Sequence, residues 1–453
     1  MHSKTIPFLG MILIWAVVNG SAASHAEEAF PPPRPLGSDL PTFQISTPSE
    51  GTPGEPTGMI TLHQALALAL MRNPELAAFS WEVRAREAAL LQSGLFPNPA
   101  LRADVQDIDI GRAGDGVYQR ETTLQLSQLI ELGGKRSKRK EVAFLNGRLA
   151  GWDYETKRIE VFTQLSLAFI DLLGAQQQQT LADETVRLAE EVARIATERV
   201  RAGKVSPLEE TRANVALSTV RIEQERAMRE FQAARRRLAA AWGSTAPQFE
   251  GVEGRLDFTV PVPSLSQLSQ RLSQNPEIAR WETVLTWRQA AIDLETSKRI
   301  PDLDVAAGVR RVESQRTPLF VIGLTLPLPV FNRNQGGIQE AQDRLRKARE
   351  EQRAVETRIA TLLSETHRSL SIAQAEVEAL RNNVLPGATR AFETASEGYR
   401  LGKFGLLDVL DTQRTLFAAR AQYLRALTTY HKSVAEMERL IGEKIEIAPE
   451  RIK

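Results

Sequence analysis

The stretch "LSQLIELGGKRSKRK", residues 126–140, changes character at its two central glycines. Before them, apolar residues alternate with polar ones, and this period of two is typical of a β-strand with one apolar face. After Gly133-Gly134 comes a basic run that favours helix, with cationic side chains at five of six positions. Glycine gives the backbone the freedom that such a change of direction needs. The stretch therefore predicts a strand that is followed directly by a helix.

The chain begins with a segment that is typical of an exported protein. Residues 1–26 have the parts of a secretory signal: Lys4, the apolar run IPFLGMILIWAVV, and small residues at Ser24 and Ala26. The apolar run has 13 residues, too few to cross a bilayer comfortably, although a retained signal anchor is the alternative. No later stretch is uniformly apolar over 18 residues, so we expect no transmembrane helix after the signal.

Composition excludes several classes of protein. The formal net charge is only +1, without the basic excess expected of a nucleic-acid-binding protein. The chain has no cysteine, which excludes disulfides, thiolate metal sites and a lipid attached to an N-terminal cysteine. The five histidines are scattered without ligand spacing. We therefore expect no protein-bound metal centre and no cofactor.

The chain repeats itself after an extended arm, rich in proline and glycine, at residues 27–59. Three separated motifs recur at offsets of 202, 202 and 199 residues: RNPEL (72–76) as QNPEI (274–278), NPAL (98–101) as IPDL (300–303), and VRAGKVSPLEE (200–210) as YRLGKFGLLDV (399–409). Near-constant offsets indicate duplication. We divide the chain into a first repeat at 60–243, a linker at 244–263, a second repeat at 264–441 and a tail at 442–453.

Each repeat has the same expected order of elements. A short helix stops at Asn-Pro, because proline suits the first turn of the next helix. Strands follow at about 99–132 and 301–330, and then long helical hairpins at about 135–243 and 336–441. The first arms of these hairpins, 135–201 and 336–401, have coiled-coil spacing in patches. The fold class is therefore mainly α with β, although two generic coiled-coil hairpins are the alternative.

The strands raise a physical problem. Phe320, Ile322, Leu324, Leu326 and Leu328 share one apolar face. An open sheet in lipid leaves N–H and C=O groups at its edges without partners, and a closed barrel needs at least about eight strands. Four strands per chain must therefore either pack against a soluble core or be completed by other copies. Completion is favoured, because the apolar faces have no obvious cover other than lipid.

The basic run at 135–140 lies where the dipole of the following helix disfavours positive charge. Two interpretations are open. Anionic lipid head groups at the inner face of a membrane would stabilise it. Alternatively, it is a solvated turn held by nearby carboxylates such as Glu131 and Glu141.

The motifs RNPEL, LFPNPAL, LIELGGKR, RVRAGKVSPLE and YRLGKFGLLDVLDTQRTL, spread over residues 60–441, together resemble the TolC family of outer-membrane efflux channels. LIELGGKR is similar to the branch that serves cobalt–zinc–cadmium pumps. The resemblance implies a homotrimer with one twelve-stranded barrel in outer-membrane lipid and a tunnel of twelve helices in the periplasm. It also implies a periplasmic adaptor protein and an inner-membrane pump of the resistance-nodulation-division type as partners. Many relatives carry a lipidated N-terminal cysteine, which this chain lacks.

The resemblance also implies a gate at the tunnel end. Asp408 and Asp411 match the paired aspartates of the family's gate, and their i, i+3 spacing places both on one helix face. A threefold ring of such pairs would favour cations. The alternative is that they stabilise the first turns of their helix. Tyr399 matches the family's gate tyrosine, whereas Phe404 stands where the family has an arginine.

Two further groups of residues are predicted to lie at contact surfaces, one with the adaptor protein and one at the membrane. The hairpin turns match the tips that meet the adaptor, namely Gly203, Lys204, Val205 and Ser206, and Gly402, Lys403, Phe404 and Gly405. Chain reversal alone explains the glycines, but apolar residues at an exposed tip suggest a partner. The strand–helix junction is predicted to lie at the membrane–periplasm interface, with Gly133, Gly134, Lys135 and Arg136.

The expected function is a passive channel that exports divalent heavy-metal cations, the substrate being implied by the branch resemblance. A drug or solvent channel of the same fold is one alternative. A periplasmic adaptor is another, although an adaptor is expected to have one hairpin rather than two. The carboxylate pairs have no histidine partner or nucleophile motif beside them, so we expect no enzyme activity.

Overall fold

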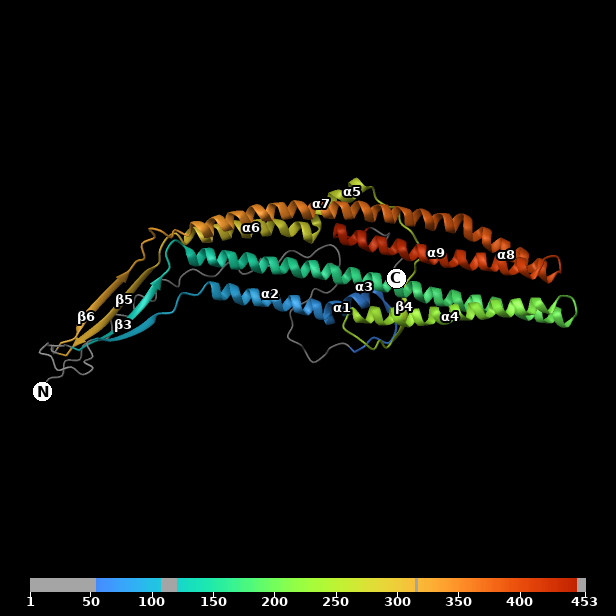
Figure 1. Cartoon of the computed structure of the whole chain (residues 1–453), viewed down its shortest axis with the longest axis horizontal. Helices are drawn as coiled ribbons and strands as arrows, with labels where there is room; N and C mark the ends of the chain where they lie inside the picture. The colour runs from blue at the N-terminus through green and yellow to red at the C-terminus, as the bar shows by residue number, and fades with distance from the viewer. Residues whose placement is uncertain (1–53, 107–119, 314–316, 446–453) are drawn as a thin grey trace.

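The structure is a computed structural model that describes residues 54–106, 120–313 and 317–445. It is an elongated molecule with a β-sheet at one end and a long helical body (Figure 1). The expected signal at 1–26, nearly all of the arm at 27–59, and most of the tail lie outside the described residues. So do residues 107–119 and 314–316, between the strands of each predicted pair.

The two repeats have the same order of elements, as the duplicated motifs predict. The first contains α1 (Leu62–Arg72), α2 (Pro74–Ser93), β2 (Ala100–Gln106), β3 (Glu121–Ile130), α3 (Lys135–Arg201) and α4 (Pro207–Ala240). The second contains α5 (Leu265–Arg271), α6 (Pro276–Ser297), β5 (Leu303–Val312), β6 (Leu319–Thr325), α7 (Gln335–Ala379), α8 (Leu385–Arg400) and α9 (Leu406–Ile441). The mainly helical fold class with strand pairs is confirmed.

The second long helical stretch, predicted at 336–401, has one irregularity. A π turn at Leu380–Val384 separates α7 from α8, and the N–H of Leu385 bonds the carbonyl of Leu380. Pro386 follows at once and has no N–H to donate to the preceding turn. A π turn is a known way for a helix to absorb such a disturbance.

A small parallel sheet, missed by the sequence analysis, crosses the middle of the body. It pairs β1 (Gly58–Thr61) with β4 (Phe249–Glu253), and β4 lies within the residues predicted as a linker. The side chain of Gln176 on α3 bonds both backbone groups of Val252, at 3.1 and 3.3 Å. The main apolar core is formed here, between this sheet and helices α1, α3, α7 and α9.

The helical body is a wall of adjacent helices rather than a compact bundle (Figure 1). In the half nearer the strands, α3 contacts α2 and α6, and α6 contacts α7. In the half nearer the hairpin turns, α3 contacts α4 and α9, and α9 contacts α8. The long helix α3 is therefore shared by both halves, whereas its neighbours change midway.

Two asparagines join the halves at equivalent points of the repeats. Asn73 accepts a hydrogen bond from the N–H of Leu76 at 2.9 Å and donates to the carbonyl of Ala241 at 2.7 Å. Asn275 accepts from the N–H of Glu277 at 2.7 Å and donates to the carbonyl of Leu440 at 2.9 Å. Each side chain thus caps one helix and binds the end of another, so α4 is followed in space by α2, and α9 by α6.

We predict that Asn275→Ala destabilises the protein by about 2 kcal/mol, because the change removes a helix cap and leaves a carbonyl without its partner. Asn275 is only 2% exposed, so water cannot replace the lost bonds. The measurement is the denaturant midpoint of the far-ultraviolet circular dichroism signal in detergent. Gln289→Ala, at an exposed position of the same helix, is the control. Equal midpoints for the two variants would contradict the role of Asn275 in joining the end of α9 to the start of α6.

Candidate functional site

The sheet at the end of the molecule joins strands from both repeats. All its pairings are antiparallel, in the order β2-β3-β5-β6. Strands β2 and β6 are therefore its edges, and neither has a second strand partner among the described residues. Each edge presents backbone N–H and C=O groups that can pair with another strand.

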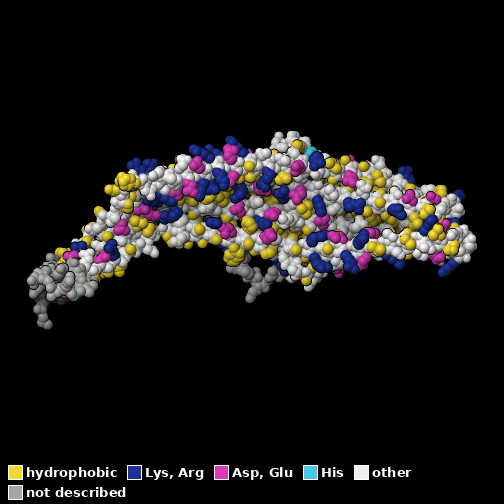
Figure 2. Space-filling model, viewed as in Figure 1, with side chains coloured by type: hydrophobic (Ala, Val, Ile, Leu, Met, Phe, Trp, Pro, Cys, Tyr) yellow, Lys and Arg dark blue, Asp and Glu magenta, His cyan; other side chains and the backbone are white. Residues whose placement is uncertain are grey.

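One face of this sheet is continuously apolar. Its register aligns two rows of side chains across the four strands: Leu101, Leu126, Ala307 and Ile322, and next to them Ala103, Leu124, Val309 and Phe320. Phe320 is 90% exposed and Ile322 is 78% exposed. Figure 2 shows hydrophobic side chains gathered around the junction of the sheet and the helical body, whereas charges of both signs cover the body.

The other face is mostly polar on β2 and β3, whereas β6 contributes Leu319 and Val321 to it. Asp104, Thr123 and Arg310 lie in one row across it. Arg310 forms an ion pair with Glu121 at 3.3 Å. An apolar face opposite a polar one is the pattern of a strand wall with lipid on one side and water on the other.

By length and composition alone, α3 is the one helix in the described part of the chain that qualifies as a membrane span. Its apolar window is 44% buried inside the protein. The helix lies in the wall between α2 or α4 on one side and α6 or α9 on the other. Its apolar residues thus serve helix packing, and the sheet carries the exposed apolar face.

The strand–helix junction depends on two glycines with left-handed backbone. Gly133 has φ 70° and Gly134 has φ 68°. A Cβ atom on Gly133 would lie 2.9 Å from the side chain of Ile300. In the second repeat the residue before the long helix is Asn334, with φ 56°, and asparagine is among the few other residues that tolerate this region.

The basic run after these glycines has partners within the chain. Lys135 pairs with Asp302 and Arg139 with Glu131, both at 2.6 Å. Arg136 and Arg139 also donate to carbonyls of Gly94 and Ser93, at 2.6 and 2.8 Å. These carbonyls lie at the C-terminus of α2, where the helix dipole favours positive charge. Of the two interpretations, the contacts favour binding inside the chain, with Asp302 as a partner that the sequence analysis missed.

The hairpin turns lie at the opposite end of the molecule from the sheet (Figure 1). Gly203 and Gly402, with φ 65° and 75°, reverse the chain after α3 and α8. Ser206 caps α4 by accepting the N–H of Leu208 at 3.3 Å. Phe404 is 45% exposed and lies against Gly398, where a Cβ atom would come within 2.0 Å of the phenyl ring.

Asp408 and Asp411 lie in the first two turns of α9, and both are exposed. The carboxylate of Asp408 accepts the N–H of Gly405 at 2.9 Å, so it also caps the helix. Asp408 lines a shallow groove of about 420 Å³ with Arg390 and Phe404. The structure thus brings Asp408 close to the predicted tip residues.

Tyr399 is buried between the two hairpins and is 2% exposed. Its hydroxyl donates to Glu209 at 3.1 Å, and the guanidinium of Arg199 lies 4.3 Å from the centre of its ring. Arg199 also donates to the carbonyl of Tyr399 at 2.8 Å. Burial, with help from Glu209, raises the pKa of the Tyr399 phenol above its ordinary value, which favours the protonated hydroxyl that donates to Glu209. The sequence analysis missed both partners.

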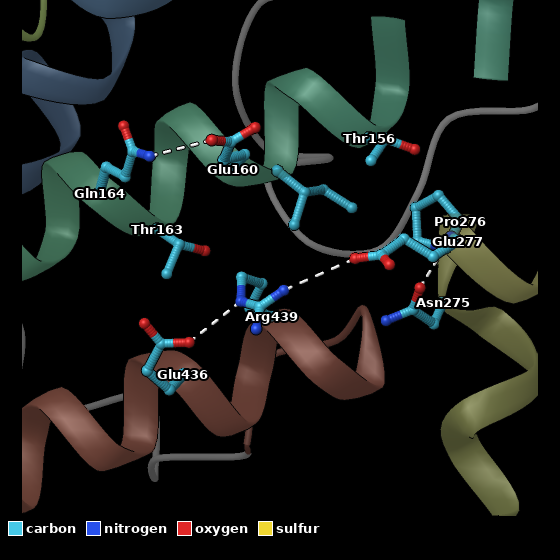
Figure 3. Close-up of a pocket in the computed structure, with 10 residues that line it drawn as sticks. Thr156, Glu160, Thr163, Gln164, Asn275, Pro276, Glu277, Glu436 and Arg439 are labelled. Atoms are coloured by element: carbon cyan, nitrogen blue, oxygen red, sulfur yellow. Dashed lines mark hydrogen bonds and ion pairs between the residues drawn. The ribbon is translucent and has the colours of Figure 1, made fainter. Parts of the chain in front are cut away.

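A cavity of about 320 Å³ lies between α3, the start of α6 and the end of α9 (Figure 3). Arg439 bridges Glu277 and Glu436, at 3.7 and 3.0 Å, and Gln164 donates to Glu160 at 3.0 Å. Glu160 also pairs with Lys157 at 3.1 Å, so each of the three acids that line this cavity has a cationic partner within the chain. No group of histidine, aspartate and glutamate side chains among the described residues has the arrangement of a metal site.

Comparison with known proteins decides the family. The model of the outer membrane efflux protein family matches residues 65–244 and 267–443, one match for each repeat. The chain belongs to this family. It is an outer-membrane efflux channel, a non-catalytic protein, with a long helical part in the periplasm.

Individual members of the outer membrane efflux family are similar along much of their length. The cobalt-zinc-cadmium resistance protein CzcC of Cupriavidus metallidurans is 35% identical over 89% of this chain and 96% of its own. The nickel-cobalt-cadmium resistance protein NccC of Alcaligenes xylosoxydans is 27% identical over 65% of each chain. The solved structure of CusC has a TM-score of 0.71 at 17% identity, covering 93% of this chain and 99% of its own.

We predict that a fluorophore at Phe320→Cys, on the apolar face of the sheet, is quenched by brominated lipids and not by iodide in water. The same fluorophore at Phe404→Cys, at the tip, is expected to respond in the opposite way. Because the chain has no cysteine, each variant carries a single labelling site. Quenching of Phe320→Cys by iodide, after reconstitution in vesicles, would contradict the assignment of the apolar face to lipid.

Proposed function

We propose that three copies of this chain assemble into one passive efflux channel. The observation that carries the proposal is the four-stranded sheet, which has an exposed apolar face and two open edges. In lipid an unpaired edge costs several kcal/mol for each unsatisfied group. Pairing β6 of one copy with β2 of the next removes every edge, and the family resemblance gives three as the number of copies. The closed wall then has twelve strands.

The helical wall supports the same assembly. Leu208, Val215 and Ile222 on α4 are exposed and lie seven residues apart. A seven-residue apolar repeat is the pattern of a seam between helices. Within one copy α4 already packs on α3 through other residues, so this second seam is free to meet a neighbouring copy.

The partners are a periplasmic adaptor and an inner-membrane pump of the resistance-nodulation-division type. The tips are the part of the molecule farthest from the sheet, and Phe404 is exposed there together with Leu401 and Leu407. Exposed apolar side chains at a tip fit contact with another protein. The adaptor contacts are proposed at both turns: Gly203, Lys204, Val205, Ser206, Gly402, Lys403, Phe404 and Gly405.

Asp408, Asp411 and Tyr399 are proposed as the gate at the tip end of the tunnel. Threefold symmetry would gather six carboxylates around one axis. Such a ring attracts cations and, through like-charge repulsion, resists full ionisation. The capping bond of Asp408 to Gly405 uses one carboxylate oxygen and leaves the other free to face the axis.

The proposed substrates are divalent heavy-metal cations. The support is the similarity to two proteins named for resistance to cobalt, zinc, cadmium and nickel, together with the carboxylates at the gate. A channel wall need not recognise its cargo, so a drug or solvent channel is the alternative. Gly133, Gly134, Lys135 and Arg136 are proposed to lie at the membrane–periplasm interface, with the two glycines as the bend and the two cations held by contacts within the chain.

The assembly is tested by the native mass of the purified protein in detergent, which should be three times that of the mature chain. The substrate is tested in cells that lack their own channel but keep a metal pump and adaptor. Restored growth in cobalt, zinc or cadmium supports the metal assignment. Restored tolerance of solvents or drugs alone would favour the alternative.

We predict that Asp408→Ala combined with Asp411→Ala raises ion conductance in planar bilayers and lowers the preference for cations, because the carboxylate ring is lost. Glu350→Ala, an exposed carboxylate on α7 far from the tips, is the matched control and should leave both unchanged. Unaltered conductance and selectivity in the double variant would remove the gate assignment.

A further inference from the structure

The apolar face of the sheet does not end where β6 ends. Every second residue from Phe320 to Val330 is apolar and exposed, although the strand itself ends at Thr325. Pro327 and Pro329 have no N–H to donate, so the hydrogen-bonded ladder cannot continue past them. The apolar row therefore continues from the sheet toward the helical body without strand pairing.

The connection from β6 to α7 differs from its counterpart in the first repeat. It has nine residues, 326–334, whereas only four, 131–134, connect β3 to α3. The shorter connection has one large apolar side chain, Leu132. In the longer one Leu328 is 75% exposed and Phe331 is 90% exposed. Residues 326–331, which we call the apolar link, are thus a feature of the second repeat that duplication does not explain.

The backbone carbonyls of the apolar link are satisfied within the chain. The carbonyl of Leu328 accepts the N–H two residues later at 2.9 Å. The side chains of Arg333 and Gln335 donate to the carbonyls of Pro329 and Phe331, at 3.3 and 3.2 Å. A segment with paired carbonyls and exposed apolar side chains can enter an apolar environment without the cost of burying unpaired polar groups.

Exposed apolar side chains are also present at the other junctions of the sheet and the helical body. Leu95 and Phe96 precede β2, Leu132 follows β3, and Ile300 precedes β5, and all four are exposed. Figure 2 shows hydrophobic side chains gathered where the chain passes from the sheet into the helices. The apolar link therefore extends the surface that the sheet presents to lipid, and it is the longest apolar segment at this level.

Two arginines without acidic partners lie beside the apolar link. Asn334 ties the connection to the end of α6, because it donates to the carbonyl and the carboxylate of Glu295 at 2.9 and 2.7 Å. Arg299 lies four residues after Glu295, and Arg333 directly precedes Asn334. Among the described residues neither arginine has a carboxylate within ion-pair distance, whereas Lys135 of the first repeat does. Guanidinium groups next to an apolar surface suit lipid phosphates.

We propose that the apolar link inserts into the inner leaflet of the outer membrane, with phospholipid as its partner, and that Arg299 and Arg333 bind the phosphates of the head groups. The link then anchors the channel at the level where strands give way to helices. Because the chain has no cysteine, no acyl chain on a cysteine supplies such an anchor. The inference rests on the lipid contact of the apolar sheet face.

The experiment uses full-length protein with a fluorophore at Phe331→Cys, in vesicles of phosphatidylethanolamine and phosphatidylglycerol. Lipids brominated near the head group should quench it about twofold more than lipids brominated near the chain end, because an interfacial segment lies at the boundary of the leaflet. Phe404→Cys, the same change at the tip, is the matched control and should respond only to iodide in water. Phe331 has no core contacts to lose, so conductance should stay at the wild-type level.

A second measurement tests the head groups in the Phe331→Cys background. Phosphatidylglycerol should quench about fivefold more than phosphatidylethanolamine with bromine at the same positions, which is the effect of one basic residue near an anionic surface. Arg299→Gln combined with Arg333→Gln should abolish this preference. Arg346→Gln is the control, because Arg346 is an exposed arginine of α7 that pairs with Asp343 at 3.0 Å, and it should leave the preference unchanged.

The outcomes are distinct. Quenching of the Phe331→Cys label by iodide and not by lipid would place the link in water and overturn the proposal. A label that responds to neither would mean that a neighbouring copy covers the link, which also overturns it. An unchanged preference for phosphatidylglycerol after both arginine changes would overturn the phosphate assignment. In all three cases lipid quenching at Phe320→Cys leaves the proposed channel in place, whereas its absence would count against the channel itself.

Discussion

A sheet edge in lipid has no water to satisfy its backbone groups, and this constraint governs the whole architecture. Four strands with two open edges and one apolar face are insufficient alone, so the strands of each copy need those of another. The helical wall is also incomplete, because the apolar seam of Leu208, Val215 and Ile222 on α4 is left exposed by the described part of the chain. In the proposed assembly each chain is therefore one sector of a tube.

Duplication explains how one sector is built. Each repeat supplies a strand pair, a long helix and a returning helix, and both repeats use an Asn-Pro joint to connect the halves of the wall. The repeats differ where their tasks differ. The second has a π turn before α8 and carries the aspartates at the start of α9, whereas α3 of the first repeat is continuous. The first repeat instead supplies Arg199 and Glu209, which hold the buried tyrosine of the second.

Local patterns in the sequence predicted much of this fold. Alternation gave the strands, Gly133-Gly134 the bend after β3, and the repeated glycines the hairpin turns, because each depends on residues that are neighbours in the chain. Contacts between distant residues were not predictable. Asp302 meets Lys135 across 167 residues, and Glu209 meets Tyr399 across 190. Neither separation corresponds to a sequence motif or a helical period from which the contact could be predicted. The β1–β4 sheet was missed because tertiary packing, not local propensity, determines it. The π turn was missed although Pro386, directly after it, is a local signal of a disturbed helix.

The asparagine joints have a consequence for how such tubes change length. Because α2 and α4 are consecutive in space but separate in the chain, the segment between the joint and the hairpin turn is a self-contained module. Adding whole heptads to both arms of a hairpin would extend the reach across the periplasm while the half beneath the membrane kept its geometry. Insertions between the asparagine joints and the hairpin turns can therefore match the length of the proposed tube to the width of the periplasm, without changes in the rest of the chain.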